Sequence, residues 1–476
     1  MHWQTQSELF LKHHWGYTHF RPFQQETVAS VLNQQDSLTL LPTGGGKSIC
    51  YQLPILFYPQ KTALIVSPLI SLMHDQVAQA RQRGFSAYAL HSNLSHKERR
   101  HIYQAFRQGE VQLLYVSPER LNHDGFIQAL QAEQRLAYIA IDEAHCISQW
   151  GHQFRPDYRL LGDLKQLFGH LSVHAFTATA PPTVKQDIIN SLNLLQPNIF
   201  QASMFRANLR LTVEHRGTKK ETLARVLRFI KQYPQQAGIL YCTSRNAVEE
   251  WVEHLREAGI AAKGYHAGMS ATMRERHMQA FMSGKLPIMV ATVAFGMGVD
   301  RGDIRFVIHT SSPATLEAYL QEAGRAGRDG QPSECLLLWR EADFTVWRKR
   351  LKDEASQNES TKASEKQLAQ QLKKLHELQL FCESVQCRHH QLTAYFGQPL
   401  AVEYCPGCDY CDTTPHPHPE SVATTLQLLS AVWRLGVEAS LSSVYGLIKG
   451  DTALLPATLV EAAQAWPVFA VQPKAT

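Results

Sequence analysis

The first part of the chain alternates short apolar runs with longer segments of helical character. This alternation extends over residues 20–199, and each apolar run has the length of a buried strand. Strands buried on both faces and separated by helices are typical of a parallel sheet that helices cover. The runs that predict strands are 37–41, 63–66, 113–116, 137–141 and 173–176.

One helix in this block has sequence signals at both of its ends. Ser95, with Glu98 three residues later, forms a capping box in which each side chain can bond to the backbone N–H of the other residue. Gly109 suits the end of the helix, because glycine readily adopts the left-handed conformation found there. We therefore expect a helix between Ser95 and Gly109.

A second alternating block follows at about residues 209–339. Its predicted strands are 239–242, 288–291, 306–309 and 335–338. Two helical apolar faces lie among them, formed by Leu223, Val226, Leu227 and Ile230, and by Val248, Trp251, Val252 and Leu255. The predicted fold class is therefore α/β, with two tandem domains built on parallel sheets.

The composition changes after Trp339. Residues 342–377 are polar and charged and predict an exposed helix, with a solvated linker as the alternative over 353–364. Residues 413–419 are rich in proline, which has no amide hydrogen to donate, and predict a linker. The predicted domains are 1–205, 206–341, 342–412 and 413–476.

Composition and charge narrow the function classes only slightly. A chain of 476 residues exceeds one hydrophobic core, and its formal net charge of +5 permits nucleic-acid binding without requiring it. The first residues lack the pattern of a secretion signal, and no run is apolar enough to span a bilayer. We therefore expect a cytoplasmic protein without a membrane partner, whose nine cysteines do not form a disulfide framework.

A glycine-rich loop follows the first predicted strand and opens a helical segment. Its residues are Thr43, Gly44, Gly45, Gly46, Lys47 and Ser48. Glycine lets backbone N–H groups surround phosphates, Lys47 can reach the outer phosphates, and the Ser48 hydroxyl can bind Mg²⁺. Leucine stands at position 41, where the strict pattern has glycine, but strand, loop, Lys-Ser and helix follow in the expected order.

Two carboxylates stand directly after the predicted strand at 137–141. An Asp-Glu pair is usually a solvated turn, but here it follows an apolar strand downstream of a phosphate loop. Asp142 is a candidate for holding Mg²⁺ with Ser48, and Glu143 for the base that activates water. The next residues interleave aromatic side chains with arginine, which suits unstacked nucleobases. This stretch therefore predicts coupling between a nucleotide and a nucleic acid.

Two arginines in the second block are candidates for contact with a nucleotide. Arg325 and Arg328 are three residues apart, so on a helix they would share a face and could reach across a cleft to a γ-phosphate. A surface helix with salt bridges is the alternative.

A segment upstream of the phosphate loop contains candidates for recognition of the base. A glutamine amide can pair with adenine through two hydrogen bonds, and an aromatic ring can stack on it. Gln24 and Tyr17 have these chemistries.

Together these motifs resemble those of the superfamily-two helicases of the RecQ family. The resemblance runs from about Tyr17 to Cys411. The matching segments are 17–25, 43–48, 67–72, 117–120, 142–145, 177–180, 291–300 and 321–329. Each of them alone would indicate only a helicase, whereas the aromatic loop at 147–158 resembles the RecQ loop residue by residue.

The resemblance implies two RecA-like domains with ATP and Mg²⁺ in the cleft between them. It adds Arg21 to the base-recognition segment and Gln321 to the catalytic residues Lys47, Asp142, Glu143, Arg325 and Arg328. The residues that it assigns to DNA contact or coupling are His145, Trp150, His152, Phe154, Arg155, Thr177 and Thr179. Among them, His145 is expected to link the aromatic loop to the second domain.

Four cysteines have the spacing of a metal site. Cys387, Cys405, Cys408 and Cys411 form Cys-x17-Cys-x2-Cys-x2-Cys, and a closed set of four thiolates predicts structural Zn²⁺. The resemblance includes a zinc module at this place. Cys382 is a competitor for the first ligand, and His389 and His390 are expected on a helix surface. The other cysteines, Cys50, Cys146, Cys242 and Cys335, are expected in the core.

The segment after the zinc module departs from the family pattern. Family members commonly carry a complete winged helix there, whereas residues 413–476 are few for one. Leu426, Leu429, Val432 and Trp433 give one helical face, and residues 443–448 resemble part of a winged-helix core. We expect a linker and a shortened winged helix.

The predicted function is an ATP-dependent DNA helicase in repair or recombination, and the resemblance implies movement in the 3′–5′ direction. Its expected partners are single-stranded DNA, duplex or forked DNA and a single-strand DNA-binding protein, and the expected state is a monomer. Three alternatives are a DNA-stimulated translocase that unwinds weakly, a nucleotide-switched DNA-binding scaffold, and an RNA helicase.

Overall fold

The computed structural model describes most of the first 412 residues. The described residues are 3–42, 44–122, 124–148, 155–296, 301–357, 362–400, 405, 407–412, 429, 430, 432 and 444. The chain divides into two compact units, Met1–Asp412 and Thr413–Thr476. The expected winged helix lies almost wholly outside the described residues.

The first unit contains a seven-stranded sheet in the order β3-β4-β2-β5-β6-β1-β7. Every pair in it is parallel. The strands are β1 (Ser37–Leu40), β2 (Thr62–Val66), β3 (Ala87–Leu90), β4 (Leu113–Val116), β5 (Leu136–Ile141), β6 (Val173–Thr177) and β7 (Asn198–Gln201). Alternate residues enter two separate cores, with Leu64 in one and Ile65 in the other, so both faces are buried.

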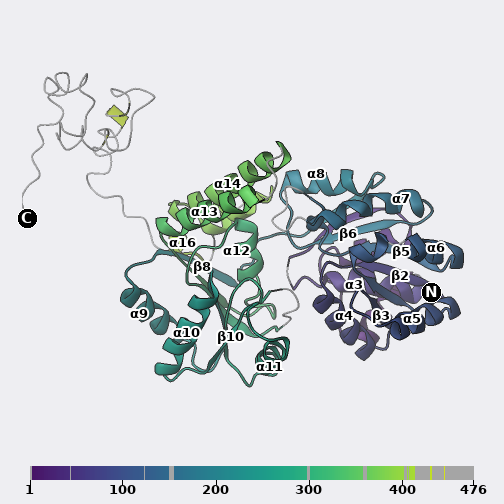
Figure 1. Ribbon diagram of the computed structural model, residues 1–476, viewed down its shortest axis with the longest axis horizontal. Coiled ribbons are helices and arrows are strands. Elements are labelled where there is room, and N and C mark those ends of the chain that lie inside the picture. The colour runs from purple at the N-terminus through teal and green to yellow at the C-terminus, as the bar shows by residue number, and fades with distance from the viewer. Residues whose placement is uncertain are drawn as a thin grey trace, which may run out of the picture. The chain divides into compact units, whose positions relative to one another are not determined.

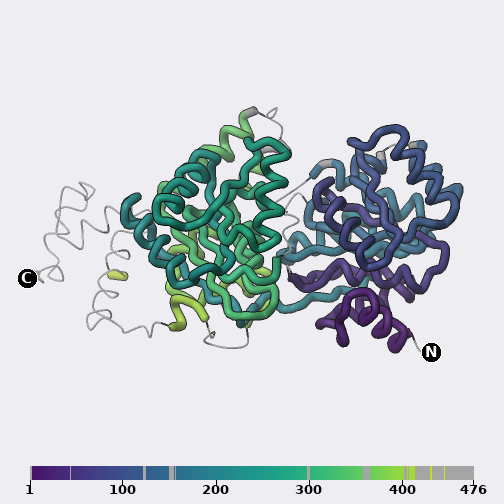
Figure 2. The backbone as a smooth tube through the Cα atoms, turned by 90° about the horizontal axis from the view of Figure 1, so that it is seen from below, coloured from purple at the N-terminus to yellow at the C-terminus, as the bar shows by residue number. Residues whose placement is uncertain are grey.

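Helices cover both faces of this first sheet (Figure 1). They are α2 (Gln24–Leu32), α3 (Lys47–Gln52), α4 (Ile70–Gln82), α5 (His96–Gln108), α6 (Asp124–Glu133), α7 (Leu164–Leu167) and α8 (Pro182–Ser191), with the 3-10 turns η1 (Leu53–Phe57), η2 (Pro118–Asn122), η3 (Ala144–Ile147) and η4 (Pro156–Asp163). The predicted capping box of Ser95 and Glu98 is present on α5, and Gly109 closes that helix. Helix α1 (Trp3–Trp15) packs against α2, α3 and η1 through Leu11 and lies on the first sheet's domain in Figure 2.

The second sheet has six strands in the order β10-β11-β9-β12-β13-β8, again with parallel pairs throughout. Its strands are β8 (Leu209–His215), β9 (Ala237–Tyr241), β10 (Ala262–Tyr265), β11 (Ile288–Ala291), β12 (Ile304–His309) and β13 (Ser333–Trp339). Its helices are α9 (Lys219–Ile230), α10 (Arg245–Glu257), α11 (Ala271–Met282) and α12 (Leu316–Ala323). The structure thus confirms the two parallel α/β domains.

A helical zinc-binding region follows the second sheet. Its helices are α13 (Glu341–Gln357), α14 (Lys362–Glu383), α15 (Arg388–Tyr395) and α16 (Asp409–Asp412). The linker alternative is therefore wrong for residues 353–357 and 362–364, which are helical. Leu378, Phe381 and Cys408 belong to the same apolar core as one face of the second sheet, so this region packs on that sheet.

Gly238 on β9 lies where the second sheet is closely packed. A Cβ atom at this position would lie 2.0 Å from the ring of Phe306, which is fully buried. Gly238→Ala should therefore lower the free energy of unfolding by about 1–3 kcal/mol, since the ring or the strand must shift. Urea unfolding followed by fluorescence measures this change. Gly125→Ala, where a Cβ meets no atom within 4 Å, is the control, and equal loss in both variants would contradict the packing.

Candidate functional site

The phosphate loop joins β1 to α3 at the edge of a cleft of about 440 Å³. Gly44 and Gly46 have φ values of 81° and 75°, a conformation that side chains with a Cβ rarely adopt. Both glycines line the cleft, as do Lys47 and Ser48. The Lys47 ammonium donates a hydrogen bond to the Leu41 carbonyl at 3.3 Å. Thr43 lies outside the described residues.

The two carboxylates that follow β5 face the same cleft. Asp142 is 6% exposed, and its Oδ1 accepts a hydrogen bond from the backbone N–H of Glu143 at 3.0 Å. Burial, then the charge of Glu143, raises the pKa of Asp142 to about 7, while Lys47 opposes this rise. Glu143 has a φ of 48°, a strained backbone conformation that is common at functional sites. Carboxylate and hydroxyl oxygens suit Mg²⁺, so Asp142 and Ser48 fit this ion.

Of the three residues proposed for base recognition, two line the cleft and one does not. Tyr17 and Arg21 line it, and Arg21 Nη1 donates to the Gly44 carbonyl. Gln24 is instead 1% exposed beneath the loop, where its Nε2 lies 3.1 Å from the Gly45 carbonyl oxygen and its Oε1 accepts from the Arg21 N–H. A contact of Gln24 with adenine would require it to exchange these bonds.

The arginine pair reaches the cleft on a turn and not on a helix. Helix α12 ends at Ala323, and Gly327 has a φ of 56°, so the expected shared helical face of Arg325 and Arg328 is wrong. The turn nevertheless places both arginines in the cleft lining, and Gln321, near the end of α12, lines the same cleft. A Cβ added to Gly44 would lie 3.0 Å from Arg328 Cγ, so this arginine lies beside the phosphate loop.

The acidic pair is connected to a neighbouring strand end through His145. His145 is 2% exposed, and its Nδ1 lies 3.2 Å from Glu143 Oε2 and 2.9 Å from Thr177 Oγ1. Thr177 in turn donates to the Thr179 carbonyl at 3.2 Å. Four of the residues proposed for catalysis or coupling therefore form one continuous group.

The aromatic loop is described only at its two ends. Trp150, His152 and Phe154 lie outside the described residues. At one end, Ser148 Oγ donates to Asp187 Oδ2 at 2.6 Å, and at the other, Arg155 Nη1 donates to the Pro68 carbonyl at 2.6 Å. The loop is thus fixed at both ends to the first sheet's domain.

The four predicted zinc ligands form one cluster. The Sγ atoms of Cys387, Cys405, Cys408 and Cys411 all lie within 4.8 Å of one another. Zn–S bonds of about 2.3 Å in a tetrahedron require sulfur atoms at such separations, so the cluster fits structural Zn²⁺. Cys382 is buried outside it, and Cys50, Cys146, Cys242 and Cys335 are buried as expected.

The expectation for His389 is wrong. This residue is 4% exposed, and its Nε2 lies 3.0 Å from the Leu209 carbonyl oxygen and 3.2 Å from that of Gly407. It therefore joins the zinc-binding region to the start of β8. His390 is exposed, as expected.

Sequence comparisons agree with this arrangement. Residues 21–187 match the DEAD/DEAH box helicase family, residues 218–330 the helicase conserved C-terminal domain, and residues 341–412 the RecQ zinc-binding family. An ATP-dependent DNA helicase RecQ from Haemophilus influenzae is 39% identical over 440 residues, which cover 92% of this chain and 69% of the relative. The chain belongs to the RecQ helicase family.

Further RecQ relatives and solved helicases resemble the chain. An ATP-dependent DNA helicase RecQ from Bacillus subtilis is 39% identical over 418 residues, covering 87% of this chain and 68% of the relative. This RecQ-family chain thus spans about two thirds of the length of these curated relatives. A DUF1998 helicase MrfA bound to DNA has a TM-score of 0.58 and 19% identity over 72% of this chain and 52% of that one, a likeness of fold alone.

As a RecQ-family ATP-dependent DNA helicase, the chain has ATP, Mg²⁺ and Zn²⁺ as its cofactors. None of the helices that the structure describes is long and apolar enough to cross a membrane.

Sequence reasoning missed part of the cleft lining of this RecQ chain. Trp15, at the end of α1, lines the cleft, as do Asp75, Gln79 and Arg83 on and just after α4. The last three are spaced at four-residue intervals, which places them on one face of a helix. A row of polar residues at four-residue intervals, directly after the helicase segment at 67–72, is the sequence signal that could have identified these residues.

Removal of one ligand should empty the zinc site. Cys405→Ser should lower the zinc content from about one ion per chain towards zero, because three thiolates no longer close the tetrahedron. Cys382→Ala is the control, since Cys382 is buried in the same core but lies outside the cluster. Zinc is counted by a colorimetric chelator on purified protein. A full zinc count in Cys405→Ser would show that the four-cysteine assignment is wrong.

Proposed function

We propose that this chain couples ATP hydrolysis in its cleft to 3′–5′ movement along single-stranded DNA and to the unwinding of duplex or forked DNA. The observation that carries this proposal is the composition of the cleft. Lys47, Asp142 and Glu143 come from the first sheet's domain, while Arg325 and Arg328 come from the second. Hydrolysis therefore depends on both domains at once, which is what a motor driven by cleft closure requires.

Each side chain has a proposed role in hydrolysis. Lys47 and the phosphate-loop N–H groups bind the phosphates, and Ser48 and Asp142 hold Mg²⁺, which neutralises charge on the phosphate oxygens. Glu143 orients or deprotonates the attacking water. Arg325 and Arg328 stabilise the charge that develops as the terminal phosphoryl group leaves, with Gln321 beside them.

The proposed coupling runs from the acidic pair to the DNA-binding loop. His145 lies beside Glu143 and Thr177, and the aromatic loop begins within a few residues of it. Trp150 and Phe154 are proposed to stack on bases, with His152 nearby and Arg155 supporting the loop through Pro68. A change at Glu143 on hydrolysis would thus reach the loop through one buried ring.

Several finer points belong to the same proposal. They are monomeric action, single-strand DNA-binding protein as a partner, a cytoplasmic location and domain boundaries at 205, 341 and 412. The proposed single-strand DNA-binding protein partner and the cytoplasmic location are supported by the expected DNA substrate. A role in repair or recombination is consistent with the RecQ family.

One experiment separates the helicase from its alternatives. ATP hydrolysis and strand displacement are measured together on single strands, forked duplexes and blunt duplexes, with matched RNA substrates. A helicase hydrolyses ATP on single-stranded DNA and displaces the forked strand. Stimulated hydrolysis without displacement would indicate a translocase, and DNA binding without hydrolysis a scaffold.

Lys47→Ala should abolish the chemistry without abolishing DNA binding. We expect turnover to fall by about 10²–10³-fold or more, because the cation on the outer phosphates is lost from a site built to stabilise charge. Lys61→Ala, which removes an exposed lysine bonded to the Gln134 carbonyl, is the matched control. Steady-state ATPase assays measure turnover. Survival of hydrolysis in pure Lys47→Ala protein would disprove the phosphate-loop assignment.

Trp150→Ala should separate the two activities. Basal hydrolysis should stay close to that of the parent chain, while stimulation by single-stranded DNA should fall, because a stacking ring contributes about 1–3 kcal/mol per base. Both rates are read in one ATPase titration with oligonucleotide. Equal losses in basal and stimulated rates would mean that the loop has only a structural role.

A further inference from the structure

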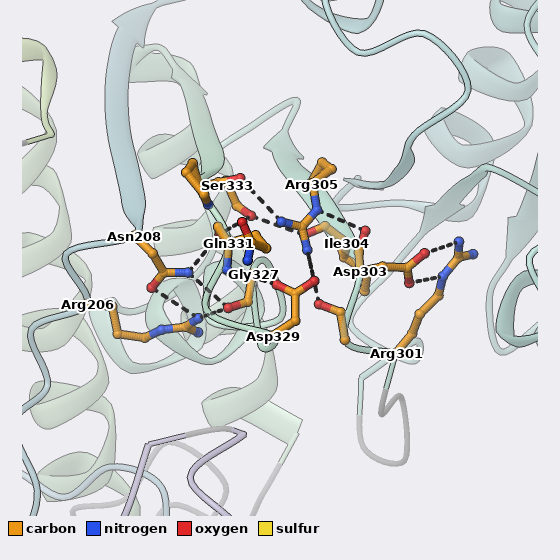
Figure 3. A network of polar contacts seen from close by, with 12 residues as sticks. Arg206, Asn208, Arg301, Asp303, Ile304, Arg305, Gly327, Asp329, Gln331 and Ser333 are labelled. Carbon is orange, nitrogen blue, oxygen red and sulfur yellow. Dashed lines mark hydrogen bonds and ion pairs between the residues drawn. The ribbon is translucent and has the colours of Figure 1, made fainter.

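The turn that carries Arg325 and Arg328 is held by hydrogen bonds from segments far away in the chain. Figure 3 shows these contacts converging on Gly327 and Asp329. The Gly327 N–H donates to the Ile304 carbonyl at 2.8 Å, and Arg305 Nη2 bonds to Asp329 Oδ2 at 2.6 Å. A non-helical turn needs such support, because it has no internal ladder of hydrogen bonds.

Arg206 supplies two of these contacts. Its Nη2 donates to the Gly327 carbonyl, as Figure 3 shows. Its Nη1 donates to the Gly324 carbonyl at 3.0 Å. Gly324 directly precedes Arg325, and Gly327 directly precedes Arg328. One planar guanidinium thus fixes the backbone immediately before each of the two arginines that line the cleft.

Arg206 lies in the connection between the two sheets. This connection runs from the end of β7 at Gln201 to the start of β8 at Leu209. At its first end, β7 pairs with β1, and the Ala202 N–H donates to the Leu40 carbonyl at 2.9 Å, so the connection starts beside the strand that leads into the phosphate loop. A small cavity lined by Pro42, Thr179, Arg206 and Gly324 lies at the same place.

We infer that Arg206 is a positioning residue that ties the arginine turn to the inter-sheet connection. Arg206 follows Gln201 by five positions, a reach of at most about 18 Å even when extended. As long as the hydrogen bonds of Arg206 hold, the turn therefore stays within a short span of Gln201, whose strand pairs with β1. When the cleft closes, the connection carries the turn with it, and Arg325 and Arg328 arrive together.

Asn208 gives the same connection a second hold on the turn. Its Nδ2 donates to the carbonyls of Gly327 and Gln331, each at 2.9 Å. Arg305 and Ile304, in contrast, hold the turn from within the second sheet. The bonds from Arg206 and Asn208 can therefore transmit movement of the connection to the turn. The bonds from Ile304 and Arg305 cannot, because these residues belong to the same sheet's domain as the turn.

The inference rests on the proposed function and predicts a particular kinetic signature. Arg206→Met keeps most of the side chain's length and removes all of its donors. With saturating single-stranded DNA, kcat should fall about 10–100-fold, since small misplacement of catalytic groups has effects of this size. The KM for ATP should stay within about twofold, because the phosphate loop that binds ATP is unchanged. Arg206→Lys should recover part of kcat by donating to one carbonyl.

The matched control is Arg225→Met on α9. Arg225 donates to Glu214 at 2.8 and 2.7 Å in the same domain, so its loss removes a similar number of bonds without touching the arginine turn. Thermal unfolding and zinc content of both variants are measured beside the kinetics. Asn208→Ala should give a smaller fall in kcat than Arg206→Met.

Three results would overturn the positioning role. The first is a kcat of Arg206→Met equal to that of Arg225→Met. The second is a rise in KM matched to the fall in kcat, together with lost thermal stability, which would mark a residue needed only for folding. The third result applies if Arg206→Met does not fold. The test then uses Arg206→Lys, and a kcat equal to that of the parent chain in this variant would overturn the positioning role. Failure of the parent chain to hydrolyse ATP with DNA would instead refute the proposed function.

Discussion

Parallel strands place all of their carboxyl ends at one edge of a sheet, and both sheets of this chain contain only parallel pairs in the described residues. The phosphate loop follows β1 and the acidic pair follows β5, so both face the same edge of the first sheet. Arg325 and Arg328, which follow α12 in the second sheet's domain, line the same cleft. The proposed site is therefore complete only when the domains of both sheets contribute side chains to one cleft.

The central strands could be predicted from sequence, and the edge strands could not. The four strands that the apolar runs did not name are β3, β7, β8 and β10, which are the two edges of each sheet. An edge strand has one neighbour and often a wetter face, so its apolar run is broken. In β10 the side chain of Lys263 is exposed, and in β7 that of Ile199 is 53% exposed. Pattern analysis detects burial, and β7, β8 and β10 are only partly buried, whereas β3 is buried at three of its four positions and is too short to stand out as an apolar run.

In the candidate site, residues whose role depends on nearby sequence could be predicted, and residues positioned by distant parts of the chain could not. Lys47, Asp142 and the four cysteines were predictable, because their chemistry depends on neighbours in sequence or on fixed spacing. The turn carrying Arg325 was not, since Gly324 and Gly327 end the helix and Arg206, more than a hundred positions upstream, holds the turn in place. Gln24 shows the same limit, because a side chain chosen for its adenine chemistry instead braces the backbone of the loop. No local pattern specifies which distant carbonyl a side chain will meet.

The zinc cluster and one face of the second sheet share a single apolar core, to which Cys387, Cys405 and Cys408 contribute beside Leu211 and Leu337. The metal site is therefore continuous with the packing of the second sheet's domain. Its ligands complete the wall against which β8 and α12 settle. Because the ligands are embedded in this core, loss of Zn²⁺ is expected to loosen the packing around β8 and α12 as well as the cluster itself.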